Sequence, residues 1–147
     1  MTEIEERKSW MSLLAKAPAV DLDRLWSALG LVPDYGYLRA PEAGGVMVRG
    51  RAGATGAPFN LGEMTVTRCS VRLRGGEVGH AYVQGRDKTH ATQAALIDAL
   101  MQTGQADAVR AAVLDPLTEA LQTARATRAA KAAATKVDFF TMARGED

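Results

Sequence analysis

The residues best suited to chemistry lie between positions 68 and 90: Arg68, Arg72, Arg86 and His90. Guanidinium groups bind phosphate oxygens through paired N–H donors, and an imidazole can exchange a proton near neutral pH. Arg68 and Arg72 are four positions apart in an alternating run, so they share one face of an expected strand, and Arg86 follows the next strand. The group predicts a phosphate-binding site, with His90 as a candidate acid–base residue.

The same residues also have a purely structural interpretation. The arginines could pair with Glu63, Asp87, Asp98 or carboxylates of a partner chain. His90 falls in the first turn of an expected helix, where the helix dipole disfavours a protonated ring, so it could equally be a packed or interface residue. Asp87 would itself occupy the helix N-terminus that a phosphate would need.

Thiol and metal chemistry have little support in the sequence. Cys69 is the single cysteine, which excludes an internal disulfide and favours a small buried side chain. His80 is expected to be half-buried, facing Val71. A metal site needs three or four ligands, and two histidines do not supply them, so no metal site is predicted.

Composition places the chain among ordinary soluble domains. It has 147 residues, 47% of them hydrophobic and 24% charged, with a formal net charge of +1. Such a balance gives no general attraction to nucleic acid or to a membrane surface. The N-terminus resembles no signal peptide, and no apolar run is long enough to span a bilayer, so a cytoplasmic protein is expected.

Helical periodicity dominates the first thirty residues. Residues 3–16 are expected to form one helix, and Asp21 is a plausible N-cap of a second helix that ends at Gly30. The pair could form a helix-turn-helix DNA reader. Its second helix, Leu22–Leu29, has Arg24 as its only basic residue, too little for phosphate contacts along DNA.

Strand-like alternation follows from Tyr35. Short strands are expected at 35–40, 46–51, 64–73 and 78–84. Gly75-Gly76 predicts a two-residue hairpin turn, which would place Cys69 opposite Tyr82. The small residues Gly79 and Ala81 would let a helix or another chain approach closely. The glycine-rich stretch 50–56 lacks the P-loop and dinucleotide-binding spacings, and is either a flexible turn or an anion cradle.

The remaining third of the chain is expected to be helical. Asp87 should cap a helix over 88–102, a helix over 107–114 should follow, and Asp115-Pro116 should begin another that runs to 134. Two aromatic residues near the terminus should be anchored, either on this domain's own core or on another chain. The predicted interface residues there are Phe139, Phe140 and Met142.

These elements predict one α+β domain over residues 1–147. Its parts would be an N-terminal helical hairpin (1–30), an antiparallel β-meander or hairpin sheet (35–86), C-terminal helices packed on that sheet (87–135) and an aromatic anchoring tail (136–147).

Four ordered segments resemble the PhnG family. They are the run Gly56–Leu73 with its Thr65-x-Thr67-Arg68-Cys69 centre, Tyr82–Ala91 continuing into Ala95–Leu100, the early Trp10-Met11 with Leu14-Ala15, and Val137–Gly145. The resemblance covers essentially the whole chain. It implies a subunit of the carbon–phosphorus lyase core complex, with PhnH, PhnI and PhnJ as partners.

The resemblance also implies a reaction. With PhnH, PhnI and PhnL, the family takes part in displacing adenine from ATP, supplied with magnesium, by an alkylphosphonate. The product is α-D-ribose 1-methylphosphonate 5-triphosphate, which implies a transferase subunit of the 2.7.8 class. No cofactor is expected on this chain, and the isolated chain is expected to be inactive. Two alternatives are a pure scaffold subunit and a self-sufficient small enzyme that binds a nucleotide or phosphonate.

Overall fold

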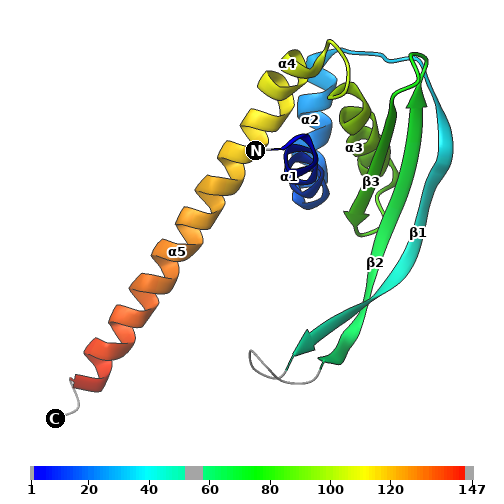
Figure 1. Ribbon diagram of the computed structural model, residues 1–147. Coiled ribbons are helices and arrows are strands. Elements are labelled where there is room, and N and C mark those ends of the chain that lie inside the picture. Colours follow the sequence, from blue (N-terminus) through cyan, green and yellow to red (C-terminus); the bar gives the residue numbers. More distant parts are fainter. Residues whose placement is uncertain (1, 52–57, 145–147) are drawn as a thin grey trace.

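The computed structural model describes the backbone of residues 2–51 and 58–144, and side chains within these ranges except those of 48, 49, 51, 58–61 and 138–144. A three-stranded antiparallel sheet in the order β1-β2-β3 carries helices on one face (Figure 1). The α+β fold predicted from the sequence is confirmed. The glycine-rich residues 52–56 fall outside the described part of the chain.

Two N-terminal helices pack beside the sheet. α1 (Glu3–Lys16) begins with a capping box between Thr2 and Glu5, and α2 (Ala19–Leu29) ends at Gly30, whose φ is +72°. Glycine adopts this left-handed conformation without the steric cost that a Cβ imposes. The predicted start of α2 after Asp21 is wrong. Pro18 stands at the N-cap, where its missing N–H leaves no helical hydrogen bond unmade.

The first strand is far longer than the sequence indicates. β1 (Tyr35–Arg51) runs through Pro41 and Gly44-Gly45 and pairs with β2 (Pro58–Leu73), so the two short strands expected at 35–40 and 46–51 are one. Proline is tolerated because β1 is an edge strand with register shifts on both sides of Arg39. The glycines pair with Val66 and Thr65 in the ladder instead of turning.

The predicted register between β2 and β3 (Val78–Gln84) is wrong by one residue. Cys69 faces Ala81, not Tyr82, and His80 faces Ser70, not Val71. The Leu73 N–H donates to the Glu77 carbonyl and Gly76 has a φ of +100°, so the loop holds three residues, Arg74 to Gly76. Three-residue hairpin loops typically end in such a positive-φ glycine. His80 is consequently exposed, not half-buried.

One helix covers the sheet most closely. α3 (Lys88–Leu100) packs on β2 and β3, and it carries the centre of the hydrophobic core in Ala91, Ala95 and Ile97. A Cβ at Gly79 would collide with the Ala95 carbonyl and lie 2.7 Å from the Ala99 nitrogen. The close helix approach predicted from the small residues is therefore confirmed at Gly79. Cys69 lies in the same core, 1% exposed, as predicted.

The remaining helical segments form one continuous rod. α4 (Ala106–Val109) passes into a π-helical turn, η1 (Arg110–Leu114), and then into α5 (Asp115–Arg144). The predicted boundary at Asp115-Pro116 coincides with the start of α5, but the helical backbone runs into α5 without a break, so the predicted fresh N-cap at Asp115 is wrong. The proline ring would collide with the carbonyl four residues earlier in a regular α-helix, and the wider π-turn gives it room.

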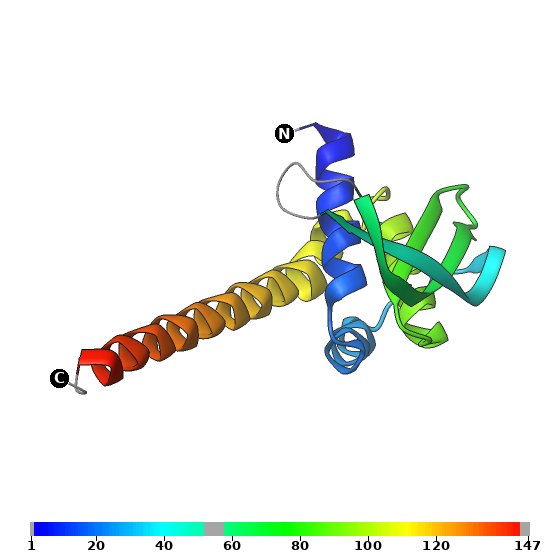
Figure 2. The ribbon, with the colours of Figure 1, turned by 90° about the horizontal axis from the view of Figure 1, so that it is seen from below.

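The last helix projects away from the body instead of packing on the sheet (Figures 1 and 2). Leu117 is buried, but every residue from Gln122 to Val137 is exposed. Packing of the C-terminal helices on the sheet, as predicted, holds for α3 and fails for α5. The helical backbone also continues through the segment expected as a separate tail, as far as Arg144.

Candidate functional site

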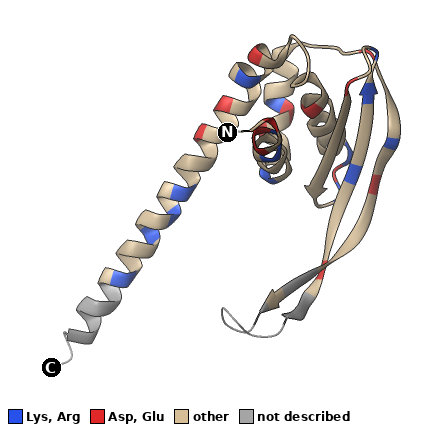
Figure 3. Cartoon of the chain, viewed as in Figure 1, with Lys and Arg blue, Asp and Glu red and all other residues tan. Residues whose placement is uncertain are grey.

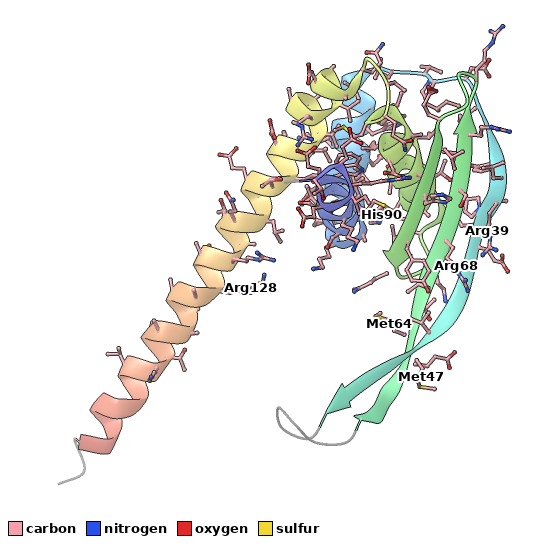
Figure 4. The ribbon with its side chains drawn as sticks, viewed as in Figure 1. Arg39, Met47, Met64, Arg68, His90 and Arg128 are labelled. Carbon is pink, nitrogen blue, oxygen red and sulfur yellow. The ribbon has the colours of Figure 1, made fainter. Side chains whose placement is uncertain are left out.

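The outer face of the sheet carries most of the residues proposed from the sequence. Side chains along β2 alternate, so Cys69 and Val71 enter the core while Arg68 and Arg72 lie exposed on the opposite face. This face is turned away from α3, as the labelled Arg39 and Arg68 show in Figure 4. Sequence reasoning placed Arg68 and Arg72 on one face, and the structure agrees.

Cross-strand pairing brings further polar residues beside these arginines. Directly opposed residues of antiparallel strands project to the same side of the sheet. Three rows cross the outer face: Gly36, Arg72 and Val78, then Arg39, Ser70 and His80, then Glu42, Arg68 and Tyr82. We call the group formed by Arg39, Arg68, Arg72, His80 and Tyr82 the arginine face. Three of these five residues are arginines, and one carboxylate, Glu42, lies beside them in the row of Arg68.

Two contacts hold side chains in place on the arginine face. The Arg68 guanidinium carbon lies 5.7 Å from the centre of the Tyr82 ring, a cation–π distance. The Ser70 hydroxyl lies 2.8 Å from His80 Nδ1. An arginine stacked on a ring keeps its N–H donors available in the guanidinium plane, so Arg68 can still bind a phosphate oxygen.

Two of the carboxylates proposed as alternative partners, Asp87 and Asp98, are engaged elsewhere, whereas Glu63 lies close to Arg86. Asp98 forms an ion pair with Arg7, and Arg74 forms one with Asp34. The Asp87 side chain accepts a hydrogen bond from the His90 backbone N–H, so it caps α3 as predicted. Among the described residues, Arg39, Arg68 and Arg72 form no ion pair with a carboxylate, although Glu42 lies opposite Arg68 on the same face.

Arg86 lies two residues beyond the end of β3. It lines a shallow cavity of about 280 Å³ with Gly44, Gly45, Glu63 and Thr65. The Arg68 guanidinium reaches toward the same strand, since Nη2 lies 3.7 Å from where a Cβ of Gly44 would be. Arg68 and Arg86 thus both lie near Gly44, together with the Glu63 carboxylate, and Arg72 lies farther along β2.

His90 is not part of this group. Its ring lies on the helix side of the sheet, 5% exposed, and Nε2–H donates to the Leu14 carbonyl at 2.8 Å. Figure 4 shows it among the helices, across the sheet from Arg39 and Arg68. A carbonyl only accepts hydrogen bonds, so this contact fixes a proton on Nε2. The interpretation of His90 as a packed residue fits this geometry.

Sequence reasoning missed Arg39, His80 and Tyr82 as members of the arginine face. A correct hairpin register would have found two of them, because His80 and Tyr82 oppose Ser70 and Arg68. Arg39 gave no usable signal. Arg39 is two positions after Tyr37, so regular alternation would place both side chains on the helix side, where the Tyr37 hydroxyl lies 3.1 Å from Thr92 Oγ1. The register shift between the two residues turns Arg39 outward instead.

An aromatic groove of about 560 Å³ lies at the edge of the sheet, away from the arginine face. Its walls come from the α2–β1 connection, β1 and α3, and include Trp26, Leu31, Tyr35 and Tyr37. Lys88 is the charged residue among those lining it. The groove suits apolar groups better than a polyphosphate.

Three further expectations concern the C-terminal aromatic residues, metal binding and membrane-spanning helices. The side chains of Phe139, Phe140 and Met142 lie outside the described residues, so their anchoring stays a prediction. Among the described residues, no three His, Cys, Asp or Glu side chains gather as they would around a metal ion. In the same part of the chain, no helix combines the length and apolar character needed to cross a membrane.

Comparison with known proteins decides the family. Residues 5–145 match the sequence model of a family described as phosphonate metabolism protein PhnG. The chain belongs to the PhnG family. The resemblance noted in the sequence is thereby confirmed over nearly its whole length.

One relative within the PhnG family is close. The α-D-ribose 1-methylphosphonate 5-triphosphate synthase subunit PhnG of Rhizobium meliloti (strain 1021) is 45% identical over 144 residues. The match covers 98% of this chain and 92% of that protein, so no substantial part of either lacks a counterpart. Its name describes one subunit of a larger enzyme.

Proposed function

We propose that this chain is a subunit of the synthase that makes α-D-ribose 1-methylphosphonate 5-triphosphate, as the name of its relative describes. It would act with PhnH, PhnI and PhnL, within the core complex that also contains PhnJ. The reaction would join ATP and an alkylphosphonate. A phosphonate oxygen forms a bond to the ribose C1′, the bond from C1′ to adenine breaks, and adenine leaves with a proton.

The observation that carries the role of this chain is the arginine face, where Arg39, Arg68 and Arg72 lie exposed on adjoining strands. A triphosphate has closely spaced anionic oxygens, and guanidinium groups bind them in paired hydrogen bonds. We assign Arg68 and Arg72 to binding the triphosphate or the phosphonate, with Arg86 beside Gly44 as a further contact. Binding energy gathered there would orient ribose C1′ for the displacement.

The open geometry explains why other subunits would be needed. The arginine face is a solvent-exposed sheet surface, and displacement at C1′ must exclude water, which would otherwise attack in place of the phosphonate. A partner chain closing over the sheet would supply that exclusion and the groups that stabilise departing adenine. The isolated chain is therefore expected to bind polyphosphate weakly and to show no turnover.

The test is adenine release from ATP and methylphosphonate by the assembled synthase subunits. The double variant Arg68→Ala/Arg72→Ala should assemble normally and lose at least tenfold in kcat/KM. Arg74→Ala is the matched control, because Arg74 is an exposed arginine at the hairpin turn, 87% accessible. Full activity of the double variant in an intact complex would contradict the assignment of these arginines.

A scaffold role is the second candidate function, and the long exposed α5 favours it. In that case substitutions on the arginine face would leave both assembly and adenine release unchanged. If the chain is instead a self-sufficient enzyme, the purified chain alone should show turnover. One set of assays on the isolated chain and the complex separates all three possibilities.

A further inference from the structure

We propose that the basic side of α5 and the β1–β2 ribbon together hold an acidic segment of another synthase subunit. The inference rests on the proposed function, because it names a docking surface within the same assembly. The β1–β2 ribbon is the part of the two strands beyond the end of β3, from Val46 paired with Met64 onward. Both arms leave the body on the same side (Figures 1 and 2).

The charge pattern of α5 identifies the chemistry of the partner. Between Glu119 and Asp138 the sequence has the basic residues Arg125, Arg128, Lys131 and Lys136, and no acidic one. Figure 3 shows this change from mixed charge at the start of α5 to basic residues alone. A solvated helix surface usually mixes both signs, so an unmixed basic run favours a carboxylate-bearing partner.

The basic residues are gathered on one side of the helix. At about 100° per residue, Arg125, Arg128 and Lys131 fall within one 120° sector, whereas Ala126, Ala130 and Ala133 occupy the opposite side. All six are exposed. Arg128 lies on the side of α5 that faces the ribbon (Figure 4). A segment bound there would thus touch cations on one flank and the ribbon on the other.

The ribbon contributes apolar contact. Met64 lies on the side of the ribbon that faces α5, while the neighbouring Met47, 55% exposed, points away (Figure 4). A two-stranded ribbon without a third strand is marginally stable in water, so contact with a partner would stabilise it. The flexible methionine side chain adapts to the shape of the surface it meets.

A second copy of this chain is a poor occupant. Two α5 helices meeting through Arg125, Arg128 and Lys131 would oppose like charges, which weakens association. A partner subunit presenting Asp and Glu beside apolar side chains fits both flanks. Its binding should weaken as salt concentration rises, because the cations of α5 are exposed to solvent.

The experiment uses the full chain, tagged and co-expressed with the other synthase subunits. The variant Arg125→Gln/Arg128→Gln/Lys131→Gln should weaken association at least tenfold, and the corresponding Glu variant should weaken it further. The control Lys8→Glu/Arg24→Glu/Arg74→Glu makes the same change in net charge as the Glu variant, at exposed positions outside α5. It should associate like the wild type. Circular dichroism checks that all variants remain helical.

The outcomes separate this inference from the proposed function. If the wild-type chain associates with no other subunit, the proposed function fails and this inference fails with it. If the wild type associates and the Glu variant does so equally well, only the docking surface is overturned. Self-association of the isolated chain that disappears in the Glu variant would assign the surface to a second copy, and would also overturn the proposal.

Discussion

Arg7 Nη2 lies 2.8 Å from Asp98 Oδ2, although the two residues are 91 positions apart and the Asp98 side chain is fully buried. The same carboxylate accepts hydrogen bonds from Trp10 Nε1 and from the His80 backbone N–H, both at 2.8 Å. The hydrogen bond to Asp98 raises the pKa of Arg7. One carboxylate thereby joins α1, β3 and α3.

The Asp98 junction predicts a large loss of stability in Asp98→Asn. An amide has one acceptor oxygen and carries two donors, so it cannot satisfy the three groups that point at Asp98. Unpaired buried donors and the loss of the Arg7 pair should lower the free energy of unfolding by about 3 kcal/mol or more. Urea unfolding measures the change. Asp107→Asn, at an exposed position, should change stability by less than about 0.5 kcal/mol. Equal stability of the two variants would contradict the role of Asp98.

The contact between Gly79 and α3 predicts that Gly79→Ala is destabilising. The new Cβ would meet backbone atoms of Ala95 and Ala99, which cannot move without shifting the helix. Overpacking of this kind costs about 1–3 kcal/mol or more. Gly36→Ala is the matched control in the same sheet, because nothing lies within 4 Å of its added Cβ. Thermal unfolding should show a lower Tm for Gly79→Ala alone, and equal Tm values would count against close helix packing here.

Alanine substitutions at the two adjacent glycines of the hairpin loop should lower the unfolding free energy by different amounts. Gly76 has a φ of +100°, which disfavours any L side chain, so Gly76→Ala should cost about 1–2 kcal/mol in unfolding free energy. At Gly75 the three atoms nearest to an added Cβ belong to the flexible Glu77 carboxylate, which can move aside, so Gly75→Ala should cost little. Urea unfolding of both variants is the measurement. A larger loss at Gly75 would show that the loop turns differently.

Burial of Cys69 predicts a pH-dependent contribution to stability. Burial raises the pKa of the thiol above its usual 9.0, while a hydrogen bond with Thr92 acts in the opposite direction. Above pH 9 the unfolded chain therefore loses the thiol proton before the folded chain does, and the unfolding free energy falls as pH rises. Below that pH the contribution is fully present.

The check compares wild type with Cys69→Ala by urea unfolding between pH 7.5 and 10. Titrating groups that both proteins share cancel in this comparison, so the difference in unfolding free energy reports on Cys69 alone. That difference should be constant up to about pH 8.5 and should shrink above it. A difference that stays constant to pH 10 would show that Cys69 is not shielded from solvent in the folded state.

Much of the helical structure could be predicted, because its signals are local. The ends of α1, the cap at Asp87 and the stop at Gly30 each depend on a few neighbouring residues. The sheet was harder to predict because its geometry depends on the partner strand. Gly44-Gly45 resembles a turn in isolation, yet pairing with β2 offsets the intrinsic cost of glycine in a strand.

The arginine face was half predictable for the same reason. Arg68 and Arg72 share a face through simple alternation within β2, which no distant contact can reverse. Arg39 reaches that face only because a register shift interrupts the alternation in β1, and such a shift has no clear sequence signature. His80 and Tyr82 were misplaced by one residue of loop length.

The π-helical turn before α5 has a consequence for the direction of the basic residues. At its end the Asp115 N–H bonds to the Arg110 carbonyl, five residues back, which is equivalent to one surplus residue in an otherwise α-helical rod. Removing that surplus would rotate everything beyond it by about 100° around the rod axis. Arg128 would then swing away from the ribbon while α5 kept almost the same length. A single residue in the π-helical turn therefore determines the direction in which the basic side of α5 faces.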